Sequence, residues 1–145
     1  MPLSALDQKI QSVLGRTCES AYIDEYWYKG EYQSGVKFVF KVRNGDWQWI
    51  LFDDIDDGRL FWYQKEELDD KIFTSEGDDT YFKKVDVGAE FGLIGEKVVN
   101  VERETTDDFK LLRFYFSNNV VVTVSYALDG SENCDITIES GGEIQ

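Results

Sequence analysis

The stretch LLRFYFSNNVVVTVSYALDG, residues 111–130, decides the fold. Large apolar side chains alternate with other residues on both sides of the pair Asn118-Asn119. Alternation with a period of two is typical of strands that bury one face, and Asn tolerates the positive φ values that tight hairpin turns require. We therefore predict a β-hairpin here, followed by a second reversal of the chain at Asp129-Gly130.

The N-terminal half shows the same kind of pattern. Val36, Phe38, Phe40 and Val42 alternate with residues that include Lys37 and Lys41, as expected of a strand with one wet face. Asn-Gly and Asp-Gly pairs then mark tight turns. The predicted strands are 17–28, 36–42, 47–52 and 60–63, with turns at Lys29-Gly30 or Ser34-Gly35, at Asn44-Gly45 and at Asp57-Gly58.

The second half follows the same order, with strands at 98–105, at both arms of the hairpin 111–126 and at 134–138. This order suggests an internal duplication, with units of about 3–64 and 88–139 joined by an acidic connector, 65–87. The connector is expected to hold a short helix within 66–73. The alternative stays open that any meander with Asn-Gly and Asp-Gly turns shows this order.

The first residues predict an amphipathic helix over about 4–14. Ser4 can cap its N-terminus, Asp7 lies in the first turn, and Gly15 is well placed to end it. Apolar side chains recur at helical spacing along one stripe, which we expect to lie on a sheet. The fold class predicted is α+β: a mostly antiparallel sheet of about seven to nine strands, with an N-terminal amphipathic helix and one or two short helices.

Composition favours one domain, 1–145, with a real core. The chain is 42% hydrophobic and 15% aromatic, and 145 residues can bury a core without a disulfide or metal. Cys18 and Cys134 fit no metal or redox spacing, so we expect two buried free thiols in a reducing cytoplasm. The N-terminus shows neither a basic leader nor an apolar run, so neither a secretory signal nor a membrane span is expected.

The net charge of −14 is spread unevenly. Residues 1–52 carry six acids and six bases, residues 53–80 carry eleven acids and three bases, and residues 81–145 carry twelve acids and six bases. Such a field repels nucleic acid and anionic lipid and favours a basic protein partner. The alternative is that the acidic side chains only keep the protein in solution.

The sequence offers no recognisable catalytic constellation. Histidine is absent, which removes the usual general base and a common zinc ligand. The acidic stretch 53–58 resembles a calcium loop, but Ile55 stands at position 3 and Gln64 stands where the bidentate Glu is needed. We therefore expect no enzyme, no metal and no cofactor.

Aromatic residues gather in the first half, at 22–32, 47–49 and 61–63. Most should fill the core, but successive strand residues point to opposite faces. At least one residue of Tyr26-Trp27-Tyr28 should therefore lie outside the main core. Exposed tryptophans are preferred anchors for a partner, and we expect Trp27 and Trp62 to serve as such anchors.

The layout resembles small acidic α+β proteins of bacteria that are grouped as domains of unknown function or as immunity proteins of toxin systems. The residues that carry the resemblance are Leu14-Gly15, Leu93-Ile94-Gly95, 116–120 and Leu128-Asp129-Gly130. It implies a non-enzymatic protein that binds and blocks a partner, often a basic nuclease.

The sequence therefore predicts a cytoplasmic protein-binding domain of immunity type. The alternatives are a small-ligand or carbohydrate-binding module that uses exposed aromatic rings, and a structural subunit or homodimer joined through a strand edge. The residues predicted to contact the partner are Asp53, Asp54, Asp56, Asp57, Glu66, Asp69, Asp70, Trp27 and Trp62.

Overall fold

The computed structural model describes residues 4–53, 59–65, 80–128 and 134–140. Within these ranges the chain forms two helices and nine strands. The helices are α1 (Ala5–Val13) and α2 (Val87–Glu90). The strands are β1 (Cys18–Tyr28), β2 (Glu31–Val42), β3 (Trp47–Asp53), β4 (Arg59–Lys65), β5 (Thr80–Val85), β6 (Val98–Thr105), β7 (Phe109–Phe116), β8 (Val120–Ala127) and β9 (Cys134–Ser140).

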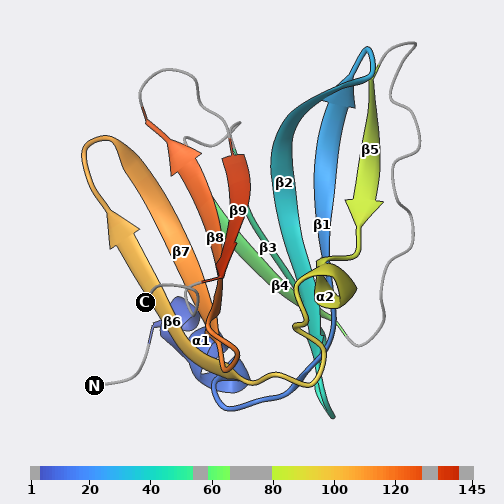
Figure 1. Cartoon of the computed structure of the whole chain (residues 1–145). Coiled ribbons are helices and arrows are strands. Elements are labelled where there is room, and N and C mark those ends of the chain that lie inside the picture. Colours follow the sequence, from blue (N-terminus) through green and yellow to red (C-terminus); the bar gives the residue numbers. More distant parts are fainter. Residues whose placement is uncertain (1–3, 54–58, 66–79, 129–133, 141–145) are drawn as a thin grey trace.

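The strands form two antiparallel sheets that face one another (Figure 1). One sheet has five strands in the order β4-β3-β2-β1-β5, and the other has four in the order β6-β7-β8-β9. The prediction of a mostly antiparallel α+β fold with an N-terminal helix is confirmed. The division into two facing sheets is new information, because period-two patterns show which side of a strand is buried but not what covers it.

The core lies between the two sheets and centres on Phe114 of β7. The Phe114 ring lies 5.5 Å from the rings of Phe38, Phe40 and Trp62, measured between centroids. These contacts join β7 of one sheet to β2 and β4 of the other. Cys18 and Cys134 are both buried and are not joined in a disulfide, as expected. Burial raises the pKa of the Cys18 thiol to about 12, so this thiol is protonated near neutral pH.

The predicted turns form where Asn or Gly takes positive φ. Asn44 has φ 57° and Asn119 has φ 69°, and both lie in the tight connections predicted for them. The β1–β2 turn is at Lys29-Gly30, where both residues have positive φ. Gly35 instead lies inside β2, at a register shift that leaves an extra residue opposite the step from Asp24 to Glu25.

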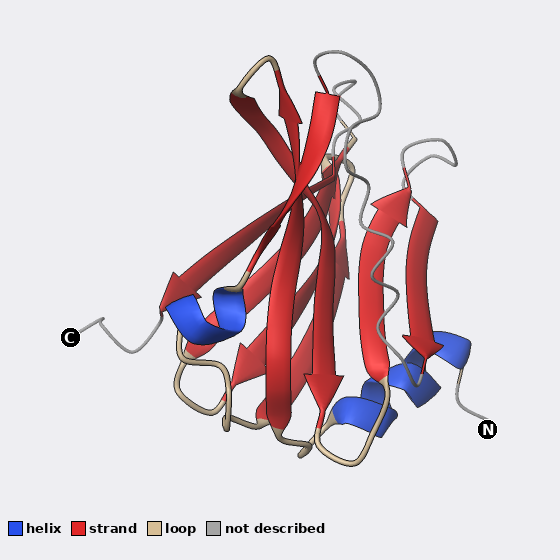
Figure 2. Ribbon diagram, turned by 90° about the vertical axis from the view of Figure 1, so that its right-hand side faces the viewer, coloured by secondary structure: helices blue, strands red, loops and turns tan. Residues whose placement is uncertain are grey.

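The apolar stripe of the leading helix packs against the core, as expected, but only at one end of the sheets. Only Val13 of α1 is fully buried, while Leu6, Ile10 and the adjacent Leu14 are partly buried against the core. Figure 2 shows α1 at one end of the sheets rather than across a face. A helix of nine residues is only about 14 Å long, so it cannot shield five strands spaced about 4.8 Å apart. Each sheet is covered by the other sheet instead.

The sheets approach one another closely along β2 and β9. The Gly35 N–H, beside the register shift, donates to the Asp135 carboxylate at 3.1 Å. The Tyr32 hydroxyl donates to the same carboxylate oxygen at 3.0 Å. Burial and this hydrogen bond raise the pKa of Tyr32, so the phenol stays a donor. The carboxylate thereby ties the two sheets together.

Strands β1–β4 and strands β6–β9 each form a four-stranded antiparallel meander. This is the order of elements on which the duplication was predicted, and the duplication itself stays a prediction. The helix predicted within 66–73 lies outside the described residues. The predicted connector, 65–87, also contains β5, which adds to the five-stranded sheet beside β1.

Candidate binding surface

The outer face of the five-stranded sheet carries a continuous row of apolar side chains. Tyr63 of β4 lies opposite Trp49 of β3, Trp49 lies opposite Val39 of β2, and Val39 lies opposite Tyr22 of β1. Each is offset by one residue from a core side chain, because neighbouring strand residues point to opposite faces. Together with Trp47 and Phe61, these residues form what we call the aromatic face.

The rings of the aromatic face pack against one another. Phe61 and Tyr63 are stacked with centroids 5.8 Å apart, and Tyr22 is stacked on Trp47 at 6.1 Å. Trp49 is only 7% exposed and Val39 only 3%, whereas Tyr63 is 48% exposed. The described elements place no second layer over this face (Figure 1). The aromatic face is therefore a small apolar cluster with the exposed Tyr63 at its rim, where Tyr22, Trp47 and Phe61 are partly buried.

Lysines surround the aromatic face. The Lys65 ammonium lies 5.8 Å from the Trp49 ring centroid, and the Lys84 ammonium lies 4.2 Å from that of Tyr22. Lys41 donates to Glu19 at 2.9 Å, and Lys37 pairs with Asp24 at 3.7 Å. Among the side chains that the structure describes, this face therefore carries four lysines and two carboxylates.

The two carboxyl groups differ in environment. The hydrogen bond from Lys41 is the main cause that lowers the pKa of Glu19. Burial raises the pKa of Asp24, against the opposing attraction of Lys37 and Lys84.

The outer face of the four-stranded sheet is different in character. Arg113, Thr123 and Thr137 lie side by side across β7, β8 and β9. The Arg113 guanidinium pairs with Glu104 at 3.2 Å and with Glu102 at 3.9 Å. Only the five-stranded sheet therefore presents an aromatic row across four adjacent strands of its outer face, among the strands the structure describes.

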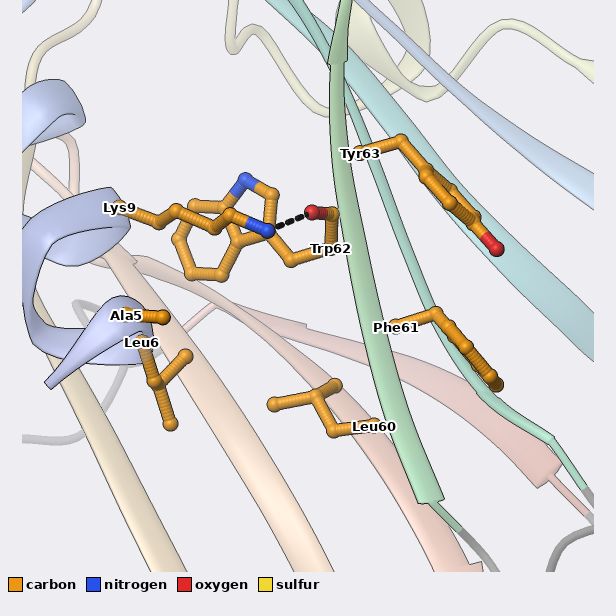
Figure 3. A pocket seen from close by; sticks show the side chains of 7 residues that line it. All are labelled: Ala5, Leu6, Lys9, Leu60, Phe61, Trp62 and Tyr63. Carbon is orange, nitrogen blue, oxygen red and sulfur yellow. Dashed lines mark hydrogen bonds between the residues drawn. The ribbon is translucent and has the colours of Figure 1, made fainter.

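The residues predicted to contact a partner are scattered by the structure. Trp62 is 4% exposed and belongs to the core, so the expectation that it anchors a partner at the surface is wrong. Its indole N–H donates to the buried Gln48 side chain at 2.7 Å, and this bond satisfies its polar group inside the core. In Figure 3 the Trp62 side chain projects toward α1, while Phe61 and Tyr63 project from the other side of β4.

Trp27 is half-buried near the β1–β2 turn, outside the main core, as is the exposed Tyr28. The prediction that part of Tyr26-Trp27-Tyr28 lies outside the main core is confirmed. The Trp27 indole donates to Glu25 at 3.0 Å, and the Lys83 ammonium lies 5.2 Å from its ring centroid. Trp27 therefore remains a candidate for contact with a partner. It lies near the β1–β2 turn, five residues along β1 from Tyr22 of the aromatic face.

The predicted acidic contacts cannot be placed as a group. Asp53 ends β3, where it pairs with Arg59 of β4 in the strand register. Asp54, Asp56, Asp57, Glu66, Asp69 and Asp70 lie outside the described residues. Their role in binding stays a prediction.

Beside the aromatic face, a groove of about 430 Å³ separates α1 from β4 (Figure 3). Ala5, Leu6 and Lys9 line it from the helix, and residues 60–63 line it from the strand. The Lys9 ammonium donates to the main-chain carbonyl of Trp62 and carries the only charge among the seven lining residues. The groove is therefore apolar with one cation at its wall.

No family model, curated protein or solved structure matches the chain. The resemblance to immunity proteins therefore stays a prediction. Over the described ranges, no helix is long and apolar enough to cross a membrane. In the same ranges, no three side chains of the Cys, Asp and Glu types gather closely enough to hold a metal ion.

Proposed function

We propose that the chain is a non-enzymatic protein-binding domain and that its partner seats on the aromatic face. The observation that carries the proposal is the row Tyr63, Trp49, Val39 and Tyr22, which crosses four strands on the outer side of the sheet. Tyrosine and tryptophan dominate binding energy at protein interfaces, because large rigid rings bury much area at little entropic cost. The non-enzymatic part rests on the sequence, which lacks histidine and the recognised catalytic motifs.

The lysines define the chemistry of the partner surface. Lys37 and Lys41 are paired with carboxylates, and the Lys65 ammonium lies over the Trp49 ring. A partner seated on the aromatic face meets the Lys65 ammonium, which favours a carboxylate opposite it. We infer a partner surface on which Asp or Glu side chains stand among apolar ones.

This contact differs from the basic partner predicted from the acidic residues at 53–70. The two hypotheses need not involve the same part of the partner, and they respond oppositely to charge reversal. Reversal of Lys65 and Lys84 should weaken contact with the aromatic face. Reversal of Asp54, Asp56 and Asp57 should weaken contact with a basic partner of immunity type.

A protein partner is favoured over a carbohydrate by the way the rings are used. On the aromatic face Trp49 is almost fully buried, and Phe61 and Tyr63 stack on each other. Stacking on a sugar requires an open aromatic ring, which Trp49 does not offer. A protein surface can instead pack against the mixed apolar and cationic rim.

The test is selection from a library of random peptides displayed on phage, with the chain immobilised. Three variants are compared with the wild type: Lys65→Glu with Lys84→Glu, Lys97→Glu with Arg103→Glu as a control of equal charge change, and the triple Asp→Lys variant at 54, 56 and 57. Lys97 and Arg103 are exposed and lie on or beside β6, away from the aromatic face.

We expect selected peptides to combine aromatic residues with Asp or Glu. They should bind the Lys97→Glu, Arg103→Glu control and fail to bind the Lys65→Glu, Lys84→Glu variant. Selection of basic peptides that only the triple Asp→Lys variant loses would replace this proposal with the basic-partner hypothesis. A selection that enriches nothing over an uncoated surface would contradict both.

A further inference from the structure

The free edge of β4 lies directly beside the aromatic face. Among the strands that the structure describes, β4 is the last of the five-stranded sheet, and β3 alone pairs with it. Lys9 donates to the Trp62 carbonyl from the side away from β3, which shows that this carbonyl points to the free edge (Figure 3). Residues two apart in a strand direct their main-chain groups the same way, so the N–H and C=O groups of Leu60 and Gln64 also point there.

Helix α1 contacts the half of this edge that runs from Trp62 to Gln64. Lys9 holds the Trp62 carbonyl, and the Gln64 side chain donates to Ser12 at 2.8 Å. The Leu60 end instead opens into the apolar groove between α1 and β4. Exposed edges with apolar side chains are templates for pairing with another extended segment, and a lysine is a common guard against it.

We propose that the Leu60 end of β4 accepts an extended segment of the protein partner by strand addition. The segment forms main-chain hydrogen bonds with Leu60, places an apolar side chain in the groove, and pairs a carboxylate with Lys9. This inference rests on the proposed function, because the groove and the aromatic face share Phe61 and Tyr63. Main-chain pairing supplies affinity in this mode, and the groove supplies specificity.

The positive charge of Lys9 favours an incoming segment that carries a carboxylate. Lys9 carries the only charge among the lining residues, and its ammonium has three N–H donors, of which the Trp62 carbonyl accepts one. A carboxylate on the incoming segment complements the remaining donors.

A second copy of the chain fits less well. Two β4 strands paired antiparallel about Trp62 would bring the basic residues Arg59 and Lys65 opposite each other. Two chains of net charge −14 also repel each other.

The probe is a synthetic peptide of seven residues, the length of β4, in which Leu and Val alternate with Glu. Three relatives of this peptide serve as comparisons. One has Lys in place of Glu, one has its residues scrambled, and one is methylated at alternate main-chain nitrogens so that it cannot donate along one edge. Binding is followed by tryptophan fluorescence and by hydrogen exchange of the Leu60 amide.

We expect the Glu peptide to bind and to slow exchange of the Leu60 amide. The Lys peptide and the methylated peptide should each bind about tenfold more weakly or worse. Equal binding of the methylated peptide would overturn strand addition, because it would show that main-chain pairing contributes nothing. Concentration-dependent dimerisation of the chain without peptide would overturn the choice of a partner segment over a second copy.

Two variants of α1 test the groove itself. Ala5→Phe fills it from an exposed position, and Lys9→Glu reverses its charge. Both should lower affinity for the Glu peptide about tenfold, whereas Gln11→Glu, on the same helix but outside the groove, should leave it unchanged.

The variant Lys65→Glu with Lys84→Glu separates this inference from the proposed function. Retained peptide binding there, together with loss in the α1 variants, assigns binding to the edge even if the aromatic face binds nothing. Unchanged binding in both α1 variants overturns the edge site, whatever the result for the aromatic face.

Discussion

At the scale of single residues, Asp24 shows how burial and ion pairing compete beside the aromatic face. It lies in register between Lys37 of β2 and Lys84 of β5, and its side chain is only 16% exposed. Both lysines favour the charged carboxylate, yet burial outweighs them and the pKa of Asp24 is raised. The charged form is thus held in the folded chain at a cost.

The sign of this shift predicts a pH dependence. The pKa of an unfolded Asp is about 3.9, and the pKa of Asp24 in the folded chain is higher. Ionised Asp24 therefore lowers the free energy of unfolding at neutral pH, and this loss disappears as pH falls through the raised pKa. We expect Asp24→Asn to be more stable than the wild type at pH 7, with the difference closing toward about pH 4 in urea unfolding.

Glu19 provides the opposite case on the same face. Its pKa is lowered, so it stabilises the fold above the unfolded value, about 4.3, and that stabilisation is lost as pH falls through the folded pKa. Glu19→Gln should therefore be slightly less stable than the wild type at pH 7.

The prediction for Asp24 has its own contrary outcome. If Asp24→Asn were less stable than the wild type at every pH, the stabilising ion pair with Lys37 would outweigh the cost of burying the Asp24 carboxylate.

At the scale of elements, the contact between β2 and β9 fixes how the two sheets meet. A Cβ added to Gly35 would stand 3.0 Å from the Ile136 Cβ and 3.1 Å from the Ile136 main-chain nitrogen. The nitrogen belongs to the β8–β9 sheet and cannot rotate away. Gly35→Ala should therefore lower the free energy of unfolding by about 1–3 kcal/mol, measured by urea unfolding with tryptophan fluorescence.

Ser34→Ala is the matched control, because it removes a hydroxyl from the neighbouring residue of the same strand without adding an atom near β9. It should change the free energy of unfolding by no more than about 0.5 kcal/mol. Equal stability of the Gly35→Ala variant and this control would show that β9 yields to the added methyl group, and that the contact does not hold the sheets in place.

The elements were more predictable than their packing. The positive-φ residues Asn44 and Asn119 and the cap at Ser4 are local features, and the sequence predicted them because their causes lie within a few residues. The bulge beside Gly35 was not predicted; in the structure the Gly35 N–H donates to Asp135, one hundred residues away. Long-range partners leave no signal in a local pattern.

The same reason explains the error at Trp62. The pattern of β4 places Leu60 and Trp62 on one face and Phe61 and Tyr63 on the other, but both pairs are apolar. Nothing local says which face meets the second sheet. In the structure the Trp62 face is buried and its indole N–H donates to Gln48, a buried glutamine that has the sequence pattern of an ordinary surface residue.

At the scale of the whole molecule, charge is divided between surfaces. The chain carries 29 acidic and 15 basic residues, whereas the outer face of the five-stranded sheet has an excess of lysine among its described side chains. Like charges within a compact chain repel one another and lower its stability. In the proposed function, an acidic partner surface is attracted to these lysines instead. Salt screens both effects, so stability and binding should respond to it in opposite directions.

We therefore expect the urea midpoint of unfolding to rise when sodium chloride is raised from about 0.01 M to about 0.15 M, because the Debye length falls from about 30 Å to about 8 Å. Over the same range, affinity for an acidic peptide should fall. The double variant Asp107→Asn, Asp108→Asn removes two exposed negative charges from the β6–β7 turn, so its unfolding midpoint should depend less on salt. A wild-type midpoint that falls with salt would mean that ion pairs such as Arg113 with Glu104 contribute more to stability than the net repulsion removes.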